Sequence, residues 1–143
     1  MKKHLIATAA LGLLAANAMA VELREIEVRT GTDGLSPLSV SIDNRSGREV
    51  VCVGELAHWF SAELARAPAG ATARIALWFD PETGTTSALN AHKENMPVES
   101  LWCGIAGRAY ETRSQVALKR DVDAPDTTLA LICVLAEDRL VCE

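Results

Sequence analysis

Apolar and polar residues alternate with a period of two in several short stretches of the chain. Leu38, Val40 and Ile42 are separated by serines, and residues 71–79 alternate in the same way. This period is typical of a β-strand with one buried face, whereas the continuous apolar run at residues 50–53 is typical of a strand covered on both faces. The pattern predicts eight strands, at residues 25–29, 38–42, 50–53, 71–79, 85–89, 108–118, 129–135 and 140–142.

Clusters of turn-forming residues separate the predicted strands. Asp-Asn-Arg-Ser-Gly occupies residues 43–47, Pro-Ala-Gly occupies residues 68–70, and Asp-Pro-Glu-Thr-Gly occupies residues 80–84. Short strands divided by such turns are typical of all-β sandwiches. The sequence therefore predicts an immunoglobulin-like antiparallel β-sandwich, with helix as an alternative at residues 57–66 and 97–106.

The first twenty residues have the three parts of a bacterial signal peptide. Lys2 and Lys3 precede an apolar run at residues 5–16, and Ala18-Met19-Ala20 provides a small-x-small ending. This pattern predicts cleavage after Ala20, and the run is too short to span a membrane. We expect export of an unfolded chain, since no twin arginine is present, and no lipid anchor, since no cysteine follows the cleavage site. Residues 21–143 should form a single soluble domain in the periplasm, with the extracellular space as the alternative.

Four cysteines in an exported domain indicate two disulfides. A hairpin with Glu137-Asp138 at its turn would place Cys133 opposite Cys142, at a non-hydrogen-bonded pair where the two Cα atoms approach closely. Cys52 and Cys103 remain as the second pair. A redox-active dithiol is not expected, because the chain lacks Cys-x-x-Cys spacing.

The charge of the chain narrows the class of partner. Without Lys2 and Lys3, the chain has 12 Lys and Arg residues and 19 Asp and Glu residues, which gives a net charge of −7. An acidic domain is a poor ligand for nucleic acid or for an anionic membrane surface. The expected partner is another exported protein.

An acidic segment provides the best metal-binding hypothesis. Asp121, Asp123 and Asp126 fall within six residues, in a segment that contains a proline. Hard cations such as calcium or a lanthanide prefer several oxygen ligands from one bent loop. Asp80 and Glu82 form a second acidic turn, although the spacing of an EF-hand is absent. A bound hard cation is thus the one candidate cofactor.

Catalytic motifs are absent from the sequence. His58 and His92 do not have the spacing of a zinc hydrolase or of a c-type haem site, and no Gly-x-Ser-x-Gly occurs. We expect no enzymatic activity. A small enzyme built around His58 is a third alternative, because Ser61 lies nearby in sequence.

Tryptophans provide candidate contact residues for a protein partner. Trp78 should point away from Leu77 and Phe79 in an alternating strand, and Trp59 is the other surface candidate, whereas Trp102 next to Cys103 should lie in the core. The sequence favours a non-enzymatic binding or accessory module with an exposed apolar patch or a free edge strand. The alternative is a periplasmic metal-ion-binding protein that uses the acidic loops.

Overall fold

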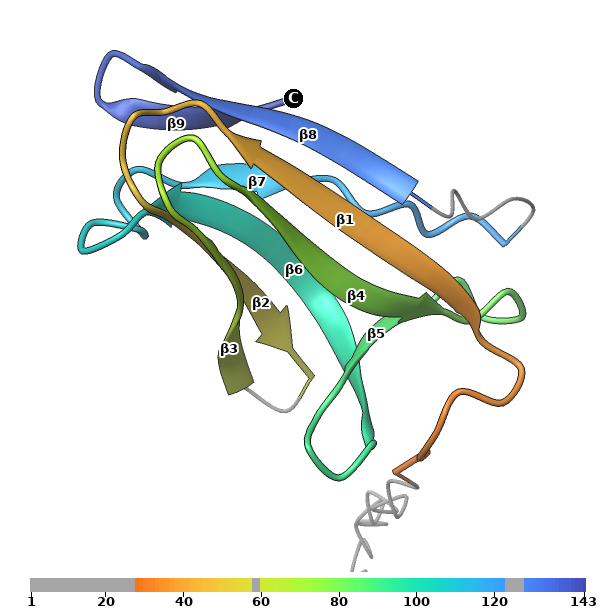
Figure 1. Ribbon diagram of the computed structural model, residues 1–143. Coiled ribbons are helices and arrows are strands. Elements are labelled where there is room, and N and C mark those ends of the chain that lie inside the picture. Colours follow the sequence, from red (N-terminus) through yellow and green to blue (C-terminus); the bar gives the residue numbers. More distant parts are fainter. Residues whose placement is uncertain (1–27, 58–59, 123–127) are drawn as a thin grey trace, which may run out of the picture.

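The structure, a computed structural model, describes residues 28–57, 60–122 and 128–143. The predicted signal peptide, His58, Trp59, Asp123 and Asp126 lie outside the described residues. Figure 1 shows that the described residues form β-strands, turns and loops, and they include no helix long and apolar enough to span a bilayer. The strands are β1 (Ser36–Asn44), β2 (Val50–Leu56), β3 (Phe60–Ala67), β4 (Thr72–Phe79), β5 (Thr86–Leu89), β6 (Asn95–Ile105), β7 (Ser114–Val116), β8 (Thr128–Ala136) and β9 (Arg139–Cys142).

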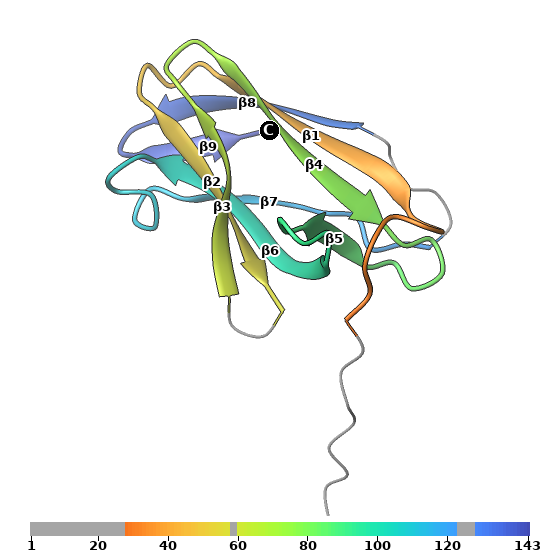
Figure 2. The same ribbon diagram turned by 60° about the horizontal axis from the view of Figure 1, so that its bottom comes forward.

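The strands form one continuous mixed sheet, which folds into two layers at β6 (Figure 2). The larger layer has the order β5-β4-β1-β8-β9, and the smaller layer has the order β3-β2-β6-β7. The first residues of β6 pair with β5, and the rest of the strand pairs with β2 and β7. In Figure 2, β1, β4 and β8 lie above β6 and β7. The layers are called the large sheet and the small sheet below.

The predicted all-β fold with two disulfides is confirmed, and the arrangement is compatible with an immunoglobulin-like sandwich. One detail of the prediction is wrong, because β1 and β8 pair in parallel, with Ser39 beside Thr128 and Asn44 beside Cys133. A period of two predicts which side chains face the core, but it contains no information about strand direction. β8 follows β7 in sequence but pairs with β1, and both run in the same direction.

Alternate residues of both sheets form the core. Val40, Ile42, Leu77 and Leu101 are at most 1% exposed, and the cysteines join this apolar cluster. Burial of such side chains is the main favourable contribution to folding, at about 25 cal/mol per Å² of apolar surface. The core therefore fixes which face of each strand is available for function.

Both predicted disulfides are confirmed, and each joins neighbouring strands of one sheet. Cys52–Cys103 links β2 to β6 with a Cα–Cα distance of 4.0 Å, and Cys133–Cys142 links β8 to β9 with a distance of 4.1 Å. Ile132 and Glu143 exchange two backbone hydrogen bonds. The adjacent cysteine pair is therefore a non-hydrogen-bonded pair, as the hairpin predicts.

The described parts of the two segments considered as alternative helices are mostly strand. Residues 57–66 contain most of β3, and residues 97–106 contain most of β6. In β3, Cys52 lies opposite Ala65 whereas Val53 lies opposite Glu63, so Leu64 is an extra residue in a β-bulge. A bulge interrupts the period of two, which is why the segment resembles a helix in sequence.

The strand predicted at residues 108–118 is present only as β7, and residues 106–113 instead fold back over the outer face of the small sheet. A Cβ atom on Gly104 would lie 2.1 Å from the carbonyl oxygen of Ala109. Trp102 points to the same outer face, because its neighbour Cys103 faces the core. Its ring meets the ring of Tyr110 edge to face, with centroids 6.2 Å apart. Trp102 is thus buried, at 8% exposure, as predicted, but it lies under this loop on the outer side of the small sheet and outside the cluster that the cysteines join.

Candidate functional site

A cavity of about 280 Å³ opens on the outer face of the large sheet, at its β5 end. Ser87 of β5 lines it, and the cross-strand partners of Ser87 are Trp78 and Pro97. Paired residues point to the same side of a sheet. The next pair along these strands, Phe79 and Thr86, points to the core, since each is 1% exposed. Ser87 and its partners therefore face outward. The cavity is called the end pocket, and its walls include Arg29, Leu35, Asp80, Thr85, Met96 and Pro97.

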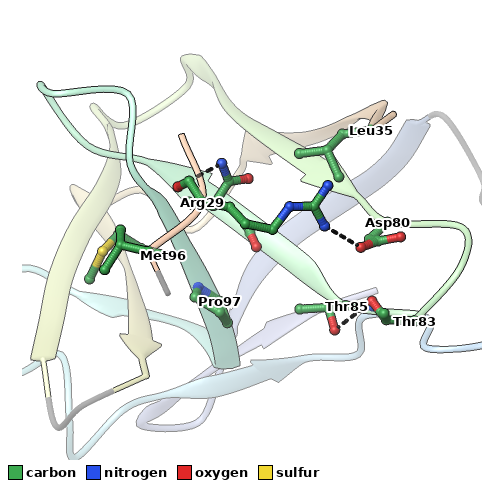
Figure 3. Close-up of a pocket in the computed structure, with 10 residues that line it drawn as sticks. Arg29, Leu35, Asp80, Thr83, Thr85, Met96 and Pro97 are labelled. Carbon is green, nitrogen blue, oxygen red and sulfur yellow. Dashed lines mark hydrogen bonds and ion pairs between the residues drawn. The ribbon is translucent and has the colours of Figure 1, made fainter. Parts of the chain in front are cut away.

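Three segments far apart in sequence form the end pocket. Residues 28–35 precede β1, residues 80–85 connect β4 to β5, and residues 95–97 begin β6. Figure 3 shows the side chain of Arg29 reaching across the pocket to Asp80. In the same view, Leu35 lies near Asp80, and Met96 and Pro97 lie on the opposite side.

Asp80 is the charged group of the pocket that the fold holds most firmly. Its side chain is 11% exposed, and its Oδ2 accepts a hydrogen bond of 2.9 Å from Nη1 of Arg29. The backbone N–H of Glu82 donates to Oδ1 at 2.9 Å. Burial raises the pKa of Asp80, but hydrogen bonds from Glu82, Thr83 and Arg29 lower the pKa more, to a value below the usual one. Asp80 is therefore an anion at neutral pH.

Residues 28–31, called the strap, run beside the start of β6. The backbone N–H of Asn95 donates to the carbonyl oxygen of Arg29 at 2.8 Å, and the N–H of Gly31 donates to the carbonyl oxygen of Lys93 at the same distance. The side-chain amide of Asn95 donates to the carbonyl oxygens of Arg29 and Gly31, at 3.1 and 2.9 Å. One isolated β-bridge, between Thr30 and Glu94, completes this pairing.

The remaining walls of the pocket combine apolar and hydroxyl groups. Leu35, Met96 and Pro97 offer apolar surface, and the hydroxyl of Thr83 donates to that of Thr85 at 3.0 Å. Binding pockets are commonly apolar with a few polar groups that orient the ligand. Such a lining can bind a side chain that has an apolar part and also carries hydrogen-bonding atoms.

The predicted contact residue Trp78 lies next to the end pocket. It is partly exposed on the outer face of β4, between its cross-strand partners Pro37 and Ser87. Its predicted orientation, opposite to Leu77 and Phe79, therefore agrees with the structure. The other predicted contact residue, Trp59, lies outside the described residues.

The predicted metal ligands fall only partly within the described chain. Asp121 is exposed, whereas Asp123 and Asp126 lie in the segment that the structure does not describe. Among residues 28–57, 60–122 and 128–143, no three His, Cys, Asp or Glu side chains form a group that could hold a metal ion. His92 is exposed in the turn between β5 and β6.

The segment before Asp121 does approach the second acidic turn. Gly84 has a φ of 71°, and a Cβ atom there would lie 2.2 Å from the carbonyl oxygen of Arg120. Only glycine accommodates both the left-handed conformation and this close approach. Arg120, the residue before Asp121, therefore lies against Gly84 of the turn that also contains Asp80 and Glu82.

The edge of β3 is the other surface that the binding hypothesis suggests. This strand ends the strand order, and its hydrogen-bonded neighbour among the described strands is β2. Arg66 forms ion pairs with Glu63 and Glu49 at this edge, and the bulge at Leu64 distorts it. Charges and bulges are devices that prevent edge strands from pairing. The end pocket is therefore the better candidate.

Arg29, Met96 and Asn95 were not predicted as site residues. Arg29 and Asp80 are 51 residues apart in sequence, so their pairing depends on the folded arrangement. The Asp80 turn carried the one usable signal, because an aspartate that starts a turn commonly accepts a backbone hydrogen bond two residues later. Asp80 was noted only for its charge.

Comparison of the chain with protein families, curated proteins and solved structures gave no match. The geometry of the end pocket is therefore the basis for a functional proposal.

Proposed function

We propose that this protein is an exported, non-enzymatic binding module that holds a segment of another exported protein at the end pocket. The observation that carries the proposal is a cavity of about 280 Å³ with an apolar wall, a hydroxyl rim and an ion pair between the buried Asp80 and the exposed Arg29. A partner's side chain of ordinary size fits a cavity of this volume. The signal-peptide pattern and the two disulfides support export.

Trp78 extends the proposed contact beyond the cavity. Its cross-strand neighbours Pro37 and Ser87 connect its ring to the pocket along one face of the sheet. Tryptophan is enriched among residues that contribute most to protein interfaces, because it buries a large rigid surface. A segment bound in the pocket would cover this ring as it leaves.

The polar groups of the pocket suit binding better than catalysis. Thr83 and Thr85 bond to each other, and Asp80 is held by Arg29. A catalytic serine or threonine needs a base within hydrogen-bond reach of its hydroxyl. The hydroxyl pair instead offers fixed donors and acceptors to a ligand.

Site-specific photo-cross-linking in the exporting cell tests the proposal. A photoreactive phenylalanine at Thr83, an exposed residue of the pocket rim, should give a discrete adduct with one partner protein. The same residue at Glu111, exposed on the loop between β6 and β7, should not. Thr85→Tyr would fill part of the cavity and should reduce the adduct at least tenfold, whereas the matched change Thr72→Tyr at the other end of β4 should not. Equal adducts from Thr83 and Glu111, or no effect of Thr85→Tyr, would contradict the proposal.

Binding of a hard cation by the acidic loops is the second candidate function. The close approach of Arg120 to Gly84 favours it, because Asp121 follows Arg120 in sequence and Glu82 belongs to the same turn as Gly84. Calcium or a lanthanide would then raise the melting temperature in proportion to RT ln(1 + [L]/Kd). The rise should disappear with EDTA and in Asp121→Asn. An unchanged melting temperature across added calcium and lanthanide would remove this candidate.

A further inference from the structure

We propose that the end pocket recognises an extended partner segment that carries an arginine, and that the strap is the chain's own occupant of the same positions. This inference rests on the proposed function and specifies its ligand. The strap would then show how a partner binds. The partner's main chain would run along the start of β6, and the guanidinium of its arginine would bind Asp80.

The charge arrangement favours an arginine as the recognised side chain. Asp80 is fixed from behind by the backbone N–H of Glu82, so Oδ2 faces the pocket. A carboxylate this buried needs a donor or a cation, because an unpaired buried charge is strongly unfavourable. Arg29 supplies the cation from the solvent side, since 61% of its side chain is exposed. The guanidinium presents its donors in a rigid planar fork, whereas the three donors of a lysine ammonium rotate on a flexible stem, so an arginine loses less freedom when it binds a fixed carboxylate.

The main-chain contacts of the strap can be made by any extended segment. Asn95 contributes its backbone N–H and its side-chain amide, and Lys93 contributes its carbonyl oxygen. Addition of a peptide strand to a sheet edge uses such main-chain bonds for affinity and side-chain pockets for specificity. In this protein Asp80 would supply the specificity.

Several features of the strap make exchange with a partner feasible. A single bridge joins it to Glu94, the residue before β6, and 55% of Val28 is exposed. Gly31 and Gly34 have φ values of 79° and 76°, so the connection to β1 contains two residues that rotate at low steric cost. Segments with few buried contacts open at low free energy. The acidic chain also attracts a cationic partner segment.

Titration with a peptide tests the inference. The probe is a fluorescent peptide with the sequence of residues 26–32, Ile-Glu-Val-Arg-Thr-Gly-Thr, followed by fluorescence anisotropy. In the wild-type protein the strap competes with the peptide. Arg29→Gln weakens this competitor while it retains the pocket, so the variant should bind the peptide at least tenfold more tightly than the wild type.

Two changes should remove this binding. A peptide with glutamine in place of its arginine should bind the Arg29→Gln variant at least tenfold more weakly, and Arg29→Gln/Asp80→Asn should lose affinity for the arginine peptide to the same extent. The matched pair Arg45→Gln/Asp43→Asn, which removes an exposed ion pair on β1, should leave peptide affinity unchanged. Circular dichroism and melting temperature check that each variant folds.

Two outcomes would overturn the inference. One is an Arg29→Gln variant that binds the peptide no more tightly than the wild type does. The other is equal binding of the arginine and glutamine peptides to the Arg29→Gln variant, a comparison that uses one protein and is therefore independent of differences in folding between variants. If the peptide fails but cross-linking from Thr83 still yields a Thr85-dependent adduct, arginine recognition is wrong and the proposed function stands. If both fail, the proposed function is wrong as well.

Discussion

The two disulfides are expected to contribute unequally to stability. The cysteines of the first are 51 residues apart and those of the second are 9 apart. In the chain-entropy description, a disulfide stabilises by restricting the unfolded chain, by about 4 kcal/mol for the longer loop and about 2.6 kcal/mol for the shorter one. Cys52→Ala/Cys103→Ala should therefore lower the free energy of unfolding by about 1.5 kcal/mol more than Cys133→Ala/Cys142→Ala does.

Native-state effects of the two changes should nearly cancel in this comparison. All four cysteines are buried, at 0–8% exposure, so each alanine pair leaves a cavity of similar size. Both disulfides also join strands that remain hydrogen-bonded after the sulfurs are removed. The difference between the variants therefore reports on the unfolded chain.

Urea unfolding followed by tryptophan fluorescence measures this difference. Linear extrapolation gives the free energy of unfolding of each variant, provided that the slopes agree. A larger loss for the Cys52 and Cys103 variant would support the reasoning. Equal losses, or a larger loss for the Cys133 and Cys142 variant, would refute it, because native contacts would then outweigh loop entropy.

Three further predictions concern single positions. Asp80→Asn should destabilise the protein by about 1.5–3 kcal/mol at pH 7, as expected for loss of hydrogen bonds to a charged group, whereas Asp43→Asn, in an exposed ion pair, should cost under about 1 kcal/mol. The pKa of Asp80 is lowered in the folded state. The stability lost in Asp80→Asn should therefore be greatest above the unfolded pKa of about 3.9, and it should vanish as the pH falls through the lower folded pKa. Urea unfolding of both proteins from pH 7 to 2.5 checks this. Gly104→Ala should lower the free energy of unfolding by about 3 kcal/mol or more, because the new Cβ would collide with the backbone of Ala109. Gly54→Ala should lower it by only about 1 kcal/mol, because its Cβ would meet the flexible end of the Leu64 side chain. Thermal melts compare the two variants. Tyr110→Ala should lower stability by at least about 0.5–1.5 kcal/mol through loss of the edge-to-face ring contact, with a red shift in tryptophan emission as the loop uncovers the indole below it.

Local sequence rules were sufficient where an interaction is local. The two-residue turn at Glu137-Asp138 and the alternation around it fix the register of β8 and β9, and so the pairing of Cys133 with Cys142. The same alternation placed Trp78 on the outer face. These predictions succeeded because side-chain direction in a strand depends only on position.

Other features depend on contacts that no local pattern encodes. The parallel pairing of β1 with β8 joins strands that are far apart in sequence, and the bulge at Leu64 exists only in the register between β2 and β3. The end pocket combines three distant segments, so Arg29 could not be assigned to Asp80 from spacing. The candidate site was therefore predictable only at Trp78 and in the acidity of the Asp80 turn.

The comparison of cross-linking from Thr83 and Glu111 tests the central claim most directly, because both positions are exposed and only Thr83 lines the end pocket. We predict one discrete adduct from Thr83, its reduction by Thr85→Tyr, and none from Glu111. Adducts of equal yield from the two positions, or an adduct from Thr83 that survives Thr85→Tyr, would contradict a partner-binding role for this pocket.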